Sequence, residues 1–447
     1  MNRLGTPVLL KLASVALATC VALGVSFVTP SYTTELRAAI VAMICLGLWL
    51  TEAVPPFVPT LVLWVAVPLL LGASSEEFGL ASVLSWSADP VLALFFGGFA
   101  LSVAATRHGI DERIAAVASR FSGGHRIGLV AAAAFATAVL SMWMSNIAAA
   151  AMMIAALRPL YTEMEPQEPF RRALLLAVAF GADFGGIATP VGSGPNAIAV
   201  AAASRQTPIT FLGWMMFGVP LAFTLTTVAV ALLVARFHVH GRLVLSLPSI
   251  RPWSMPSVAV VIVFLGTVAA WVAEPLHGMS SAMISLATSA VLFGSGLLKP
   301  EDLGRIDWAT LVLIGGGLAL GRLLEQSGLI TAAVGATNLT HAPRMAALFV
   351  LVLVSATLSA LMSNTATATM LVPLAAAIDP SPSTIILVAV GASLGVPLVI
   401  STPPNAMVYG EGIKASDLLV PGLILMLGGC VLIVLTGPAV LQRAGIP

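Results

Sequence analysis

Two short polar clusters lie inside long apolar runs of this chain, and they repeat one another. The first reads SMWMSNIAAAAM at residues 141–152, and the second reads SALMSNTATATM at residues 359–370. Each places the pattern Ser-x3-Ser-Asn among apolar residues. In a lipid bilayer such donors and acceptors must find partners, because unsatisfied polar groups are strongly unfavourable there. Two copies, one in each half, are typical of a transporter whose site lies where two repeats meet.

A second pair of interruptions follows the two clusters. Residues 185–196 read GGIATPVGSGPN, and residues 401–406 read STPPNA. Proline and glycine at this density end a helix and leave free N–H groups on one fragment and free carbonyl groups on the other. Carbonyl, Ser, Thr and Asn oxygens together can hold a hard monovalent cation, while the positive N-terminal ends of helix fragments favour an anion. One cluster and one break in each half predict two cation sites that flank one anion site.

The composition places these sites in a membrane. Of the 447 residues 59% are hydrophobic and only 9% are charged, and the mean hydropathy is +1.03. Because a soluble domain carries about 25% charged residues, we expect an integral membrane protein. The apolar runs do not alternate with polar residues, which excludes spanning β-strands. Close helix packing through small residues would explain one polar cluster, but it does not explain two matched pairs of interruptions.

The apolar runs predict an all-α chain with about 11 transmembrane helices, since roughly 17–25 apolar residues span a bilayer. The expected spans are about 7–28, 36–51, 57–72, 89–107, 211–236, 256–274, 280–298, 308–325 and 417–442, with a short surface piece near 76–87. The remaining apolar segments contain the polar interruptions.

Charge indicates that residues 127–157 form a re-entrant helical hairpin. If the N-terminus is cytoplasmic and this segment enters and leaves on one side, fifteen of the 20 lysines and arginines are cytoplasmic, which agrees with the positive-inside rule. A complete crossing would put its two basic flanks on opposite faces. We therefore expect Ser145 and Asn146 at the tip of a hairpin. The weakly charged flanks of residues 344–378 predict a second hairpin that enters from the outside.

An internal repeat divides the chain. GGFAL at 97–101 matches GGLAL at 316–320, and the two polar clusters lie 218 residues apart. Because the two hairpins enter from opposite sides, the repeats are expected to be inverted. The expected organisation is an N-terminal extra helix in 1–35, a first inverted repeat in 36–240 with hairpin 127–157 and broken helix 171–204, and a second in 241–447 with hairpin 344–378 and broken helix 384–411.

Three motifs carry a resemblance to a known family: SNT at 363–365, GSGPN at 192–196 and TPPNA at 402–406. With them the chain resembles the divalent anion/sodium symporter family, whose carriers move di- and tricarboxylates or sulfate, from its second span to its last. The resemblance implies an elevator-type transporter that forms a homodimer, with a scaffold and a moving transport domain in each protomer.

The resemblance also implies site residues. Co-transported sodium ions would be held by Ser141, Ser145, Asn146 and Gly192 and by Ser359, Ser363, Asn364 and Ser401. The substrate would contact Asn146, Ser193, Asn364, Thr365 and Thr402, with Pro403 packing close. No Lys or Arg falls within either cluster or break. The anion would then depend on neutral donors, helix ends and co-bound cations, which favours cation-coupled symport over exchange.

Two residues depart from the family pattern. Ile147, also expected at the substrate, stands where the family usually has threonine, and a lost hydrogen bond to a charged group costs roughly 1.5–3 kcal/mol. The substrate is therefore expected to be asymmetric, smaller, or more apolar at one end. Asp183 replaces a small or hydroxyl residue. Either it holds a cation or carries a proton as a coupling residue, or it pairs with Arg171 or Arg172 or with backbone donors near the membrane interface.

These observations predict a sodium-coupled secondary active symporter of small, C4 dicarboxylate-like organic dianions. It is expected in the inner (cytoplasmic) membrane, multi-pass, with a cytoplasmic N-terminus. The alternatives are an anion exchanger, a carrier of sulfate or another small anion, and a proton-coupled carrier on the same fold; a channel would differ by its far higher turnover. No nucleophile or acid–base pair at membrane depth indicates an enzyme. The expected partners are the anion, sodium, lipid and a second copy of the chain, without nucleic acid.

Overall fold

A computed structural model of the protein describes residues 33–51, 53–121, 124–162, 164–242, 252–329 and 343–447. This part of the chain is all-helical, as predicted, apart from one isolated bridge between His125 and Arg242. The predicted helix at 7–28 lies outside the described residues. Within them, five helices are long and apolar enough to cross a membrane, and shorter apolar helices of 10–17 residues accompany them.

The first half contains one helix that the apolar runs do not reveal. Its elements are α2 (Thr34–Thr51), α3 (Val58–Leu71), the 3-10 turn η1 (Glu76–Phe78), α4 (Leu80–Trp86), α5 (Pro90–Arg107), α6 (Ile110–Phe121), α7 (Arg126–Ser141), α8 (Asn146–Tyr161), α9 (Pro169–Gly185), α10 (Gly194–Ala203) and α11 (Phe211–Arg236). The unpredicted element is α6, whose sequence IDERIAAVASRF mixes charged and apolar residues and so lacks a continuous apolar run.

The second half follows the same plan. Its elements are α12 (Met255–Val272), α13 (Glu274–His277), α14 (Ser281–Gly294), η2 (Pro300–Arg305), α15 (Trp308–Gln326), α17 (Arg344–Ser359), α18 (Asn364–Ile378), α19 (Pro382–Ala392), α20 (Pro403–Gly410) and α21 (Ala415–Arg443). The helix pairs α7–α8 and α17–α18 occupy the expected hairpin ranges. The pairs α9–α10 and α19–α20 occupy the expected broken helices, each pair separated by irregular backbone.

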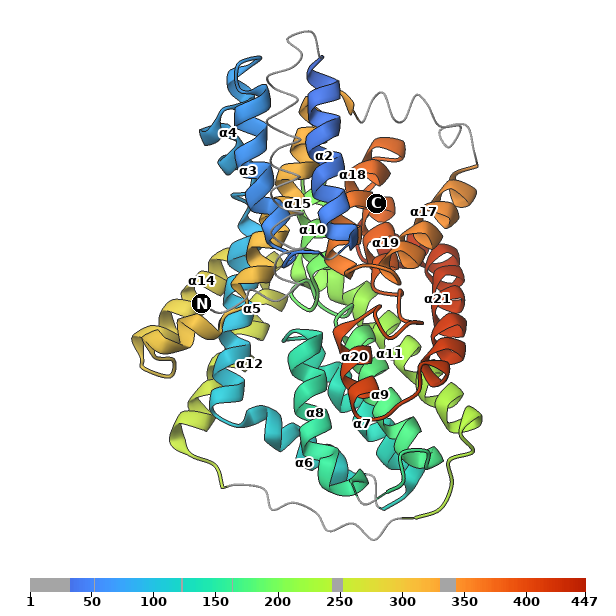
Figure 1. The fold of residues 1–447 in the computed structure, drawn as a ribbon. Coiled ribbons are helices and arrows are strands. Elements are labelled where there is room, and N and C mark those ends of the chain that lie inside the picture. The colour runs from blue at the N-terminus through green and yellow to red at the C-terminus, as the bar shows by residue number, and fades with distance from the viewer. Residues whose placement is uncertain (1–32, 52, 122–123, 163, 243–251, 330–342) are drawn as a thin grey trace, which may run out of the picture.

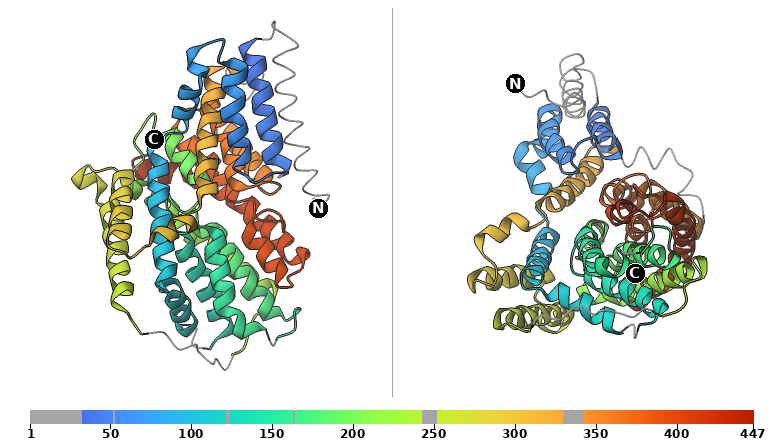
Figure 2. Two further views of the ribbon diagram at one scale, coloured as in Figure 1. Left: turned by 60° about the vertical axis from the view of Figure 1, so that its left-hand side comes forward. Right: turned by 60° about the horizontal axis from the view of Figure 1, so that its bottom comes forward.

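The two halves interlock. The pairs α7–α8 and α17–α18 lie toward opposite ends of the molecule (Figure 1), while α2, α3, α12 and α14 lie at its periphery (Figure 2). Peripheral helices of each half pack on the other half: α3 of the first half contacts α15 of the second, and α14 of the second half contacts α5 of the first. Glycines permit these contacts: a Cβ on Gly316 would lie 1.9 Å from Thr60 Oγ1, and a Cβ on Gly97 would lie 2.5 Å from Ser285 Cβ.

Helices α9 and α19 form the buried centre. Every residue of α19 is buried, as is every residue of α9 from Ala173 onward. On α9, Gly181 and Gly185 face the α7 backbone, since a Cβ at these positions would lie 2.4 Å from the Ala134 oxygen and 2.3 Å from the Ala138 oxygen. Small residues spaced by four let two helices approach closely. This packing brings the end of α9, where the first break begins, against the end of α7.

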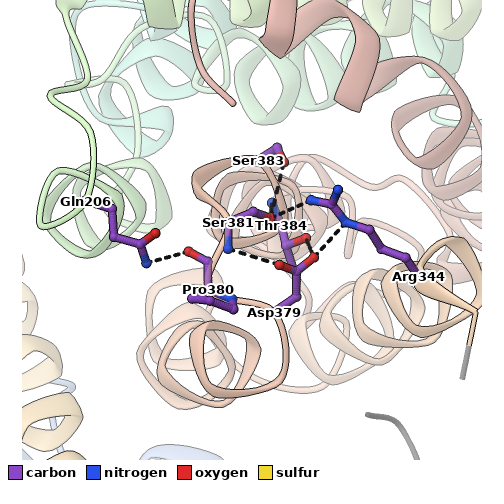
Figure 3. A network of polar contacts seen from close by, with 7 residues as sticks. All are labelled: Gln206, Arg344, Asp379, Pro380, Ser381, Ser383 and Thr384. Carbon is purple, nitrogen blue, oxygen red and sulfur yellow. Dashed lines mark hydrogen bonds and ion pairs between the residues drawn. The ribbon is translucent and has the colours of Figure 1, made fainter. Parts of the chain in front are cut away.

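A polar network fixes the outer end of the α17–α18 pair (Figure 3). Arg344 Nε donates to Asp379 Oδ2 at 2.9 Å, and Thr384 Oγ1 donates to the same oxygen at 2.8 Å. Gln206, which follows α10, donates to the Pro380 carbonyl at 2.5 Å. The network therefore ties this pair both to α19 and to the first half of the chain.

Candidate functional site

Each polar cluster forms the tip of a helix pair. α7 ends at Ser141 and α8 begins at Asn146, and the Ser145 hydroxyl accepts a hydrogen bond at 3.3 Å from the backbone N–H three residues later. Ser363 caps α18 in the same way, also at 3.3 Å. A serine at this position satisfies a backbone donor that the helix itself leaves free. The repeated Ser-Asn pattern thus ends one helix and begins the next.

At the first tip three oxygen atoms converge. The buried Ser141 Oγ lies 2.8 Å from Asn146 Oδ1 and 2.6 Å from the Ala182 carbonyl oxygen. Gly192 is next to this cluster because it packs on Gly186, which in turn packs on Asn146. A Cβ on Gly192 would lie 2.4 Å from the Gly186 oxygen, and a Cβ on Gly186 would lie 2.6 Å from Asn146 Oδ1. The residues predicted to hold the first sodium ion are therefore close together.

The second tip repeats the arrangement. Ser359 Oγ lies 2.8 Å from Asn364 Oδ1 and 2.5 Å from the Ala392 carbonyl oxygen. Ser401, in the second break, donates to the Ala360 carbonyl at 3.0 Å and so attaches the break to the tip. The residues predicted to hold the second sodium ion are therefore also close together. A hydroxyl group has one hydrogen for its two acceptors, so each tip presents more oxygen lone pairs than donors.

Two buried asparagines, for which the motifs suggested no role, hold the breaks in shape. Asn196 Nδ2 donates at 2.8 Å to each of two carbonyls of the first break, and Asn405 Nδ2 donates at 2.9 and 3.0 Å to two carbonyls of the second. Within the described residues their Oδ1 atoms have no hydrogen-bond partner. The available signal was the repeated Pro-Asn pair at 195–196 and 404–405.

Helices α8 and α18 begin at the two tips, while α10 packs on α18 and α20 packs on α8 and α9. Ser193 precedes α10, and its buried Oγ has no partner in the described part of the chain; Thr402 caps α20 by accepting from the Asn405 N–H at 3.3 Å. Gly194 lets α10 approach α18, since a Cβ there would lie 2.2 Å from Thr365 Oγ1. Gly194, directly after Ser193, and Thr365 therefore meet from different halves. Helix N-termini carry partial positive charge, which favours an anion.

Ile147 and Pro403 lie apart from the buried polar atoms. They occupy the first turns of α8 and α20, where Ile147 is 49% exposed and Pro403 is also exposed. Both therefore present apolar surface at a helix N-terminus. The structure thus brings Thr365 against the neighbouring break, but it leaves the Ile147 side chain half outside.

Asp183 belongs to the first tip and reaches the second break. Its side chain is 1% exposed, and Thr402 Oγ1 donates to its Oδ2 atom at 3.0 Å. The Asn146 side chain lies beside the same carboxyl group. This one residue therefore connects the oxygen cluster of the first half with the N-terminus of α20 in the second half.

The alternative partners considered for Asp183 bond elsewhere, at the opposite end of α9. Arg171 donates to the Met164 and Glu411 carbonyls at 2.9 and 2.8 Å, and Arg172 Nε donates to Asp417 Oδ2 at 2.8 Å. The pairing of Asp183 with either arginine is therefore wrong.

Comparison with known proteins places this architecture among transporters. A family model described as a citrate transporter matches residues 46–387. An uncharacterized transporter of Haemophilus influenzae is 29% identical over 87% of this chain and 88% of the relative. The sodium-dependent dicarboxylate transporter SdcS of Staphylococcus saprophyticus is 27% identical over 81% of this chain and 78% of the relative. The inorganic phosphate transporter PHO87 of Saccharomyces cerevisiae is 27% identical over 72% of this chain and 36% of the relative.

A solved structure shares the fold. The YdaH transporter of Alcanivorax borkumensis has a TM-score of 0.60 at 16% identity, and the match covers 91% of this chain and 99% of that chain. At this identity the likeness extends to the helical architecture alone.

Proposed function

This chain belongs to the citrate transporter family, and on that premise we propose that it is a sodium-coupled symporter of small organic dianions of the C4 dicarboxylate type. Membership makes it a multi-pass membrane protein and a secondary transporter of anions, and not an enzyme. The cation, the substrate and the transport motion are the proposed part.

The observation that carries the sodium proposal is the repeated contact of a serine hydroxyl with an asparagine oxygen and a carbonyl oxygen. At Ser141 and at Ser359 one hydrogen serves two acceptors that lie 2.5–2.8 Å away. A sodium ion would satisfy the surplus lone pairs, because hard cations bind clusters of oxygen ligands. The residues proposed to complete the two sites are Ser145, Asn146 and Gly192, and Ser363, Asn364 and Ser401.

The anion is proposed to bind between the two tips. Four helix N-termini and the two bound sodium ions would supply positive potential there, in place of lysine or arginine. The polar contacts are assigned to Asn146, Ser193, Asn364, Thr365 and Thr402. Ile147 and Pro403 would face a less polar part of the substrate, which supports an acid that is asymmetric or more apolar at one end.

The motion is proposed to be an elevator movement of inverted repeats, comprising residues 36–240 and 241–447. The opposite placement of α7–α8 and α17–α18 (Figure 1) supports re-entrant hairpins that enter from opposite faces, the first from the cytoplasm, where the N-terminus would also lie. The hairpins and broken helices would move as one domain against the peripheral helices, within a homodimer in the inner membrane. Sodium would bind first, and a domain without its cations would resist crossing.

The alternatives are a carrier of phosphate, sulfate or another small anion, an anion exchanger, and a proton-coupled carrier. The printed name of the yeast relative supports a small inorganic substrate, and the buried carboxyl group of Asp183 supports a coupling cation other than sodium alone. A requirement for a sodium gradient separates symport from exchange.

Uptake into liposomes that contain the purified protein tests the proposal. An inward sodium gradient should drive accumulation of radiolabelled succinate or citrate, and an equal potassium gradient should not. Equal uptake in sodium and potassium would refute the sodium coupling. Competition by phosphate or sulfate, without competition by any dicarboxylate or tricarboxylate, would refute the substrate class.

A further inference from the structure

Asp183 is a carboxyl group at the centre of the molecule, and no cationic side chain of the described residues bonds to it. It is 1% exposed, and the neutral hydroxyl of Thr402 donates a hydrogen bond to its Oδ2 atom. Its Oδ1 atom is buried and has no partner in the described residues. A buried carboxylate is very unfavourable unless it is paired or coordinates a metal ion.

The carboxyl group of Asp183 lies next to the place where the first cation is proposed to bind. The preceding residue, Ala182, supplies the carbonyl oxygen that Ser141 Oγ approaches at 2.6 Å. The side chain of Asn146, whose Oδ1 atom lies 2.8 Å from the same Ser141 Oγ, stands beside the carboxyl group. A buried carboxyl group thus lies beside the asparagine that contacts Ser141, and it directly follows the residue whose carbonyl oxygen contacts the same serine.

The corresponding position in the second half carries no charge. Ala182 and Ala392 correspond, because each accepts from the repeated serine of its own tip, so Asp183 corresponds to Ser393. Ser393 is also 1% exposed, and its Oγ atom has no partner within the described residues. One tip therefore adds a carboxyl group where the other adds a hydroxyl group.

We propose that Asp183 is a ligand of the first cation, so that this site holds its ion with a full negative charge and the second site holds its ion with neutral oxygens alone. The proposal rests on the proposed function for the presence of two cation sites. It follows that the first site binds sodium more tightly, since the number of charged ligands sets the affinity of an oxygen site.

The position of Asp183 also sets an order of binding. Its carboxylate is one hydrogen bond away from Thr402, which is proposed to contact the anion. An anion would be repelled by an uncompensated carboxylate in this buried, low-dielectric place. The first cation must therefore arrive before the anion does.

Binding of radioactive sodium to the purified protein, without any added anion, tests the proposal. The neutral isostere Asp183→Asn should raise the sodium concentration for half-saturation of the tighter site at least about tenfold. Asp183→Ser introduces the residue found at the corresponding position of the second half and should have the same effect. It keeps the test informative if Asp183→Asn does not fold. The matched control is Asp417→Asn, an equally buried carboxyl group that already pairs with Arg172; its sodium binding should stay like that of the wild type.

The outcomes separate this proposal from the transport function. Wild-type sodium binding in both Asp183 variants would overturn it, as would a wild-type protein that binds no sodium. If the variants lose a dependence on pH and keep their sodium affinity, Asp183 carries a proton and the proposal is wrong. If sodium binding depends on Asp183 but no anion is transported with sodium, the proposed function fails while the ligand assignment stands.

Discussion

The tips of the α7–α8 and α17–α18 pairs share their geometry but not their charge. In both, a buried serine contacts the asparagine five residues later at 2.8 Å and a carbonyl oxygen of the neighbouring broken helix. In both, an asparagine side chain holds the break by donating to two of its carbonyls. Contacts that recur in the second half indicate a task that both halves perform, and we assign cation binding to them.

The differences lie in the residues that follow these shared contacts. Thr365 in the second tip corresponds to Ile147 in the first, and Ser393 corresponds to Asp183. The first tip therefore loses a hydroxyl group on its half-exposed side and gains a carboxyl group on its buried side. If the anion binds between the tips as proposed, it would meet two unlike ends, one with hydrogen-bond donors and one that is apolar above the proposed first cation site.

The largest expected effect comes from breaking what the tips share. Asn146→Ala and Asn364→Ala each remove an oxygen from a proposed cation site and a polar group from the proposed anion site. Loss of hydrogen bonds to charged groups, each worth about 1.5–3 kcal/mol, predicts that sodium-driven uptake falls roughly 100-fold in either variant. The measurement is initial uptake into liposomes at equal protein content.

Thr436→Ala serves as the control for this prediction, because Thr436 bonds to a carbonyl of its own helix, α21, away from the tips. Its uptake should match that of the wild type. Uptake that survives in one asparagine variant and disappears in the other would show that the halves do not share the task.

A smaller effect should follow from making the first tip more like the second. Ile147→Thr restores the Asn-Thr pair of residues 364–365 and supplies a hydroxyl donor in the first turn of α8. We expect the affinity for a symmetric C4 dicarboxylate to rise about tenfold, because one hydrogen bond to a carboxylate is gained. Competition against a labelled substrate measures it.

Leu361→Thr provides the matched control for Ile147→Thr, since Leu361 is a comparably exposed apolar residue near the second tip. It should leave the affinity unchanged. An unchanged affinity in Ile147→Thr itself would mean that the substrate does not reach this side of the first tip.

The sequence allows the tips to be located but not the atoms that meet there. The charges of the hairpin flanks and the repeated Ser-Asn pattern pick out residues 127–157 and 344–378, and Ser145 and Ser363 mark helix starts through a local rule. The carbonyls of Ala182 and Ala392 could not be predicted, because a backbone acceptor leaves no trace in the identity of its residue. The α6 helix could not be predicted from apolar runs, because its apolar residues are interspersed with charged and polar ones along the chain. The bond between Asp183 and Thr402 depends on how the halves pack, which local patterns do not encode.

The two halves should also differ in how tightly their central helices, α9 and α19, pack against their neighbours. Gly181 and Gly391 correspond, but a Cβ on Gly181 would lie 2.4 Å from the Ala134 oxygen, whereas a Cβ on Gly391 would lie 3.1 Å from the Val352 oxygen. Overpacking against backbone costs about 1–3 kcal/mol, so Gly181→Ala should lower stability by that amount and Gly391→Ala by less. Thermal unfolding in detergent compares them, and equal losses would count against the tighter packing of the first half.

The smallest effect concerns the outer end of the second hairpin, where Arg344 bonds to Asp379 and Ser381. Burial by itself would raise the pKa of Asp379, but the Ser381 N–H, the Thr384 and Ser381 hydroxyls and Arg344 together hold it below its usual value.

A carboxyl group whose pKa is lower in the folded state stabilises the fold above the unfolded pKa of about 3.9, and this contribution is lost as the pH falls through the lowered value. Arg344→Gln should therefore destabilise the protein at pH 7 by about 0.2–1 kcal/mol, the range of exposed ion pairs. The difference should shrink as the pH falls below the unfolded pKa of about 3.9 and through the lowered pKa of Asp379. Arg322→Gln, which loses a single 3.4 Å contact with Glu325, is the control and should change little. A deficit in Arg344→Gln that persists at low pH would show that Arg344 acts by packing rather than through the Asp379 carboxylate.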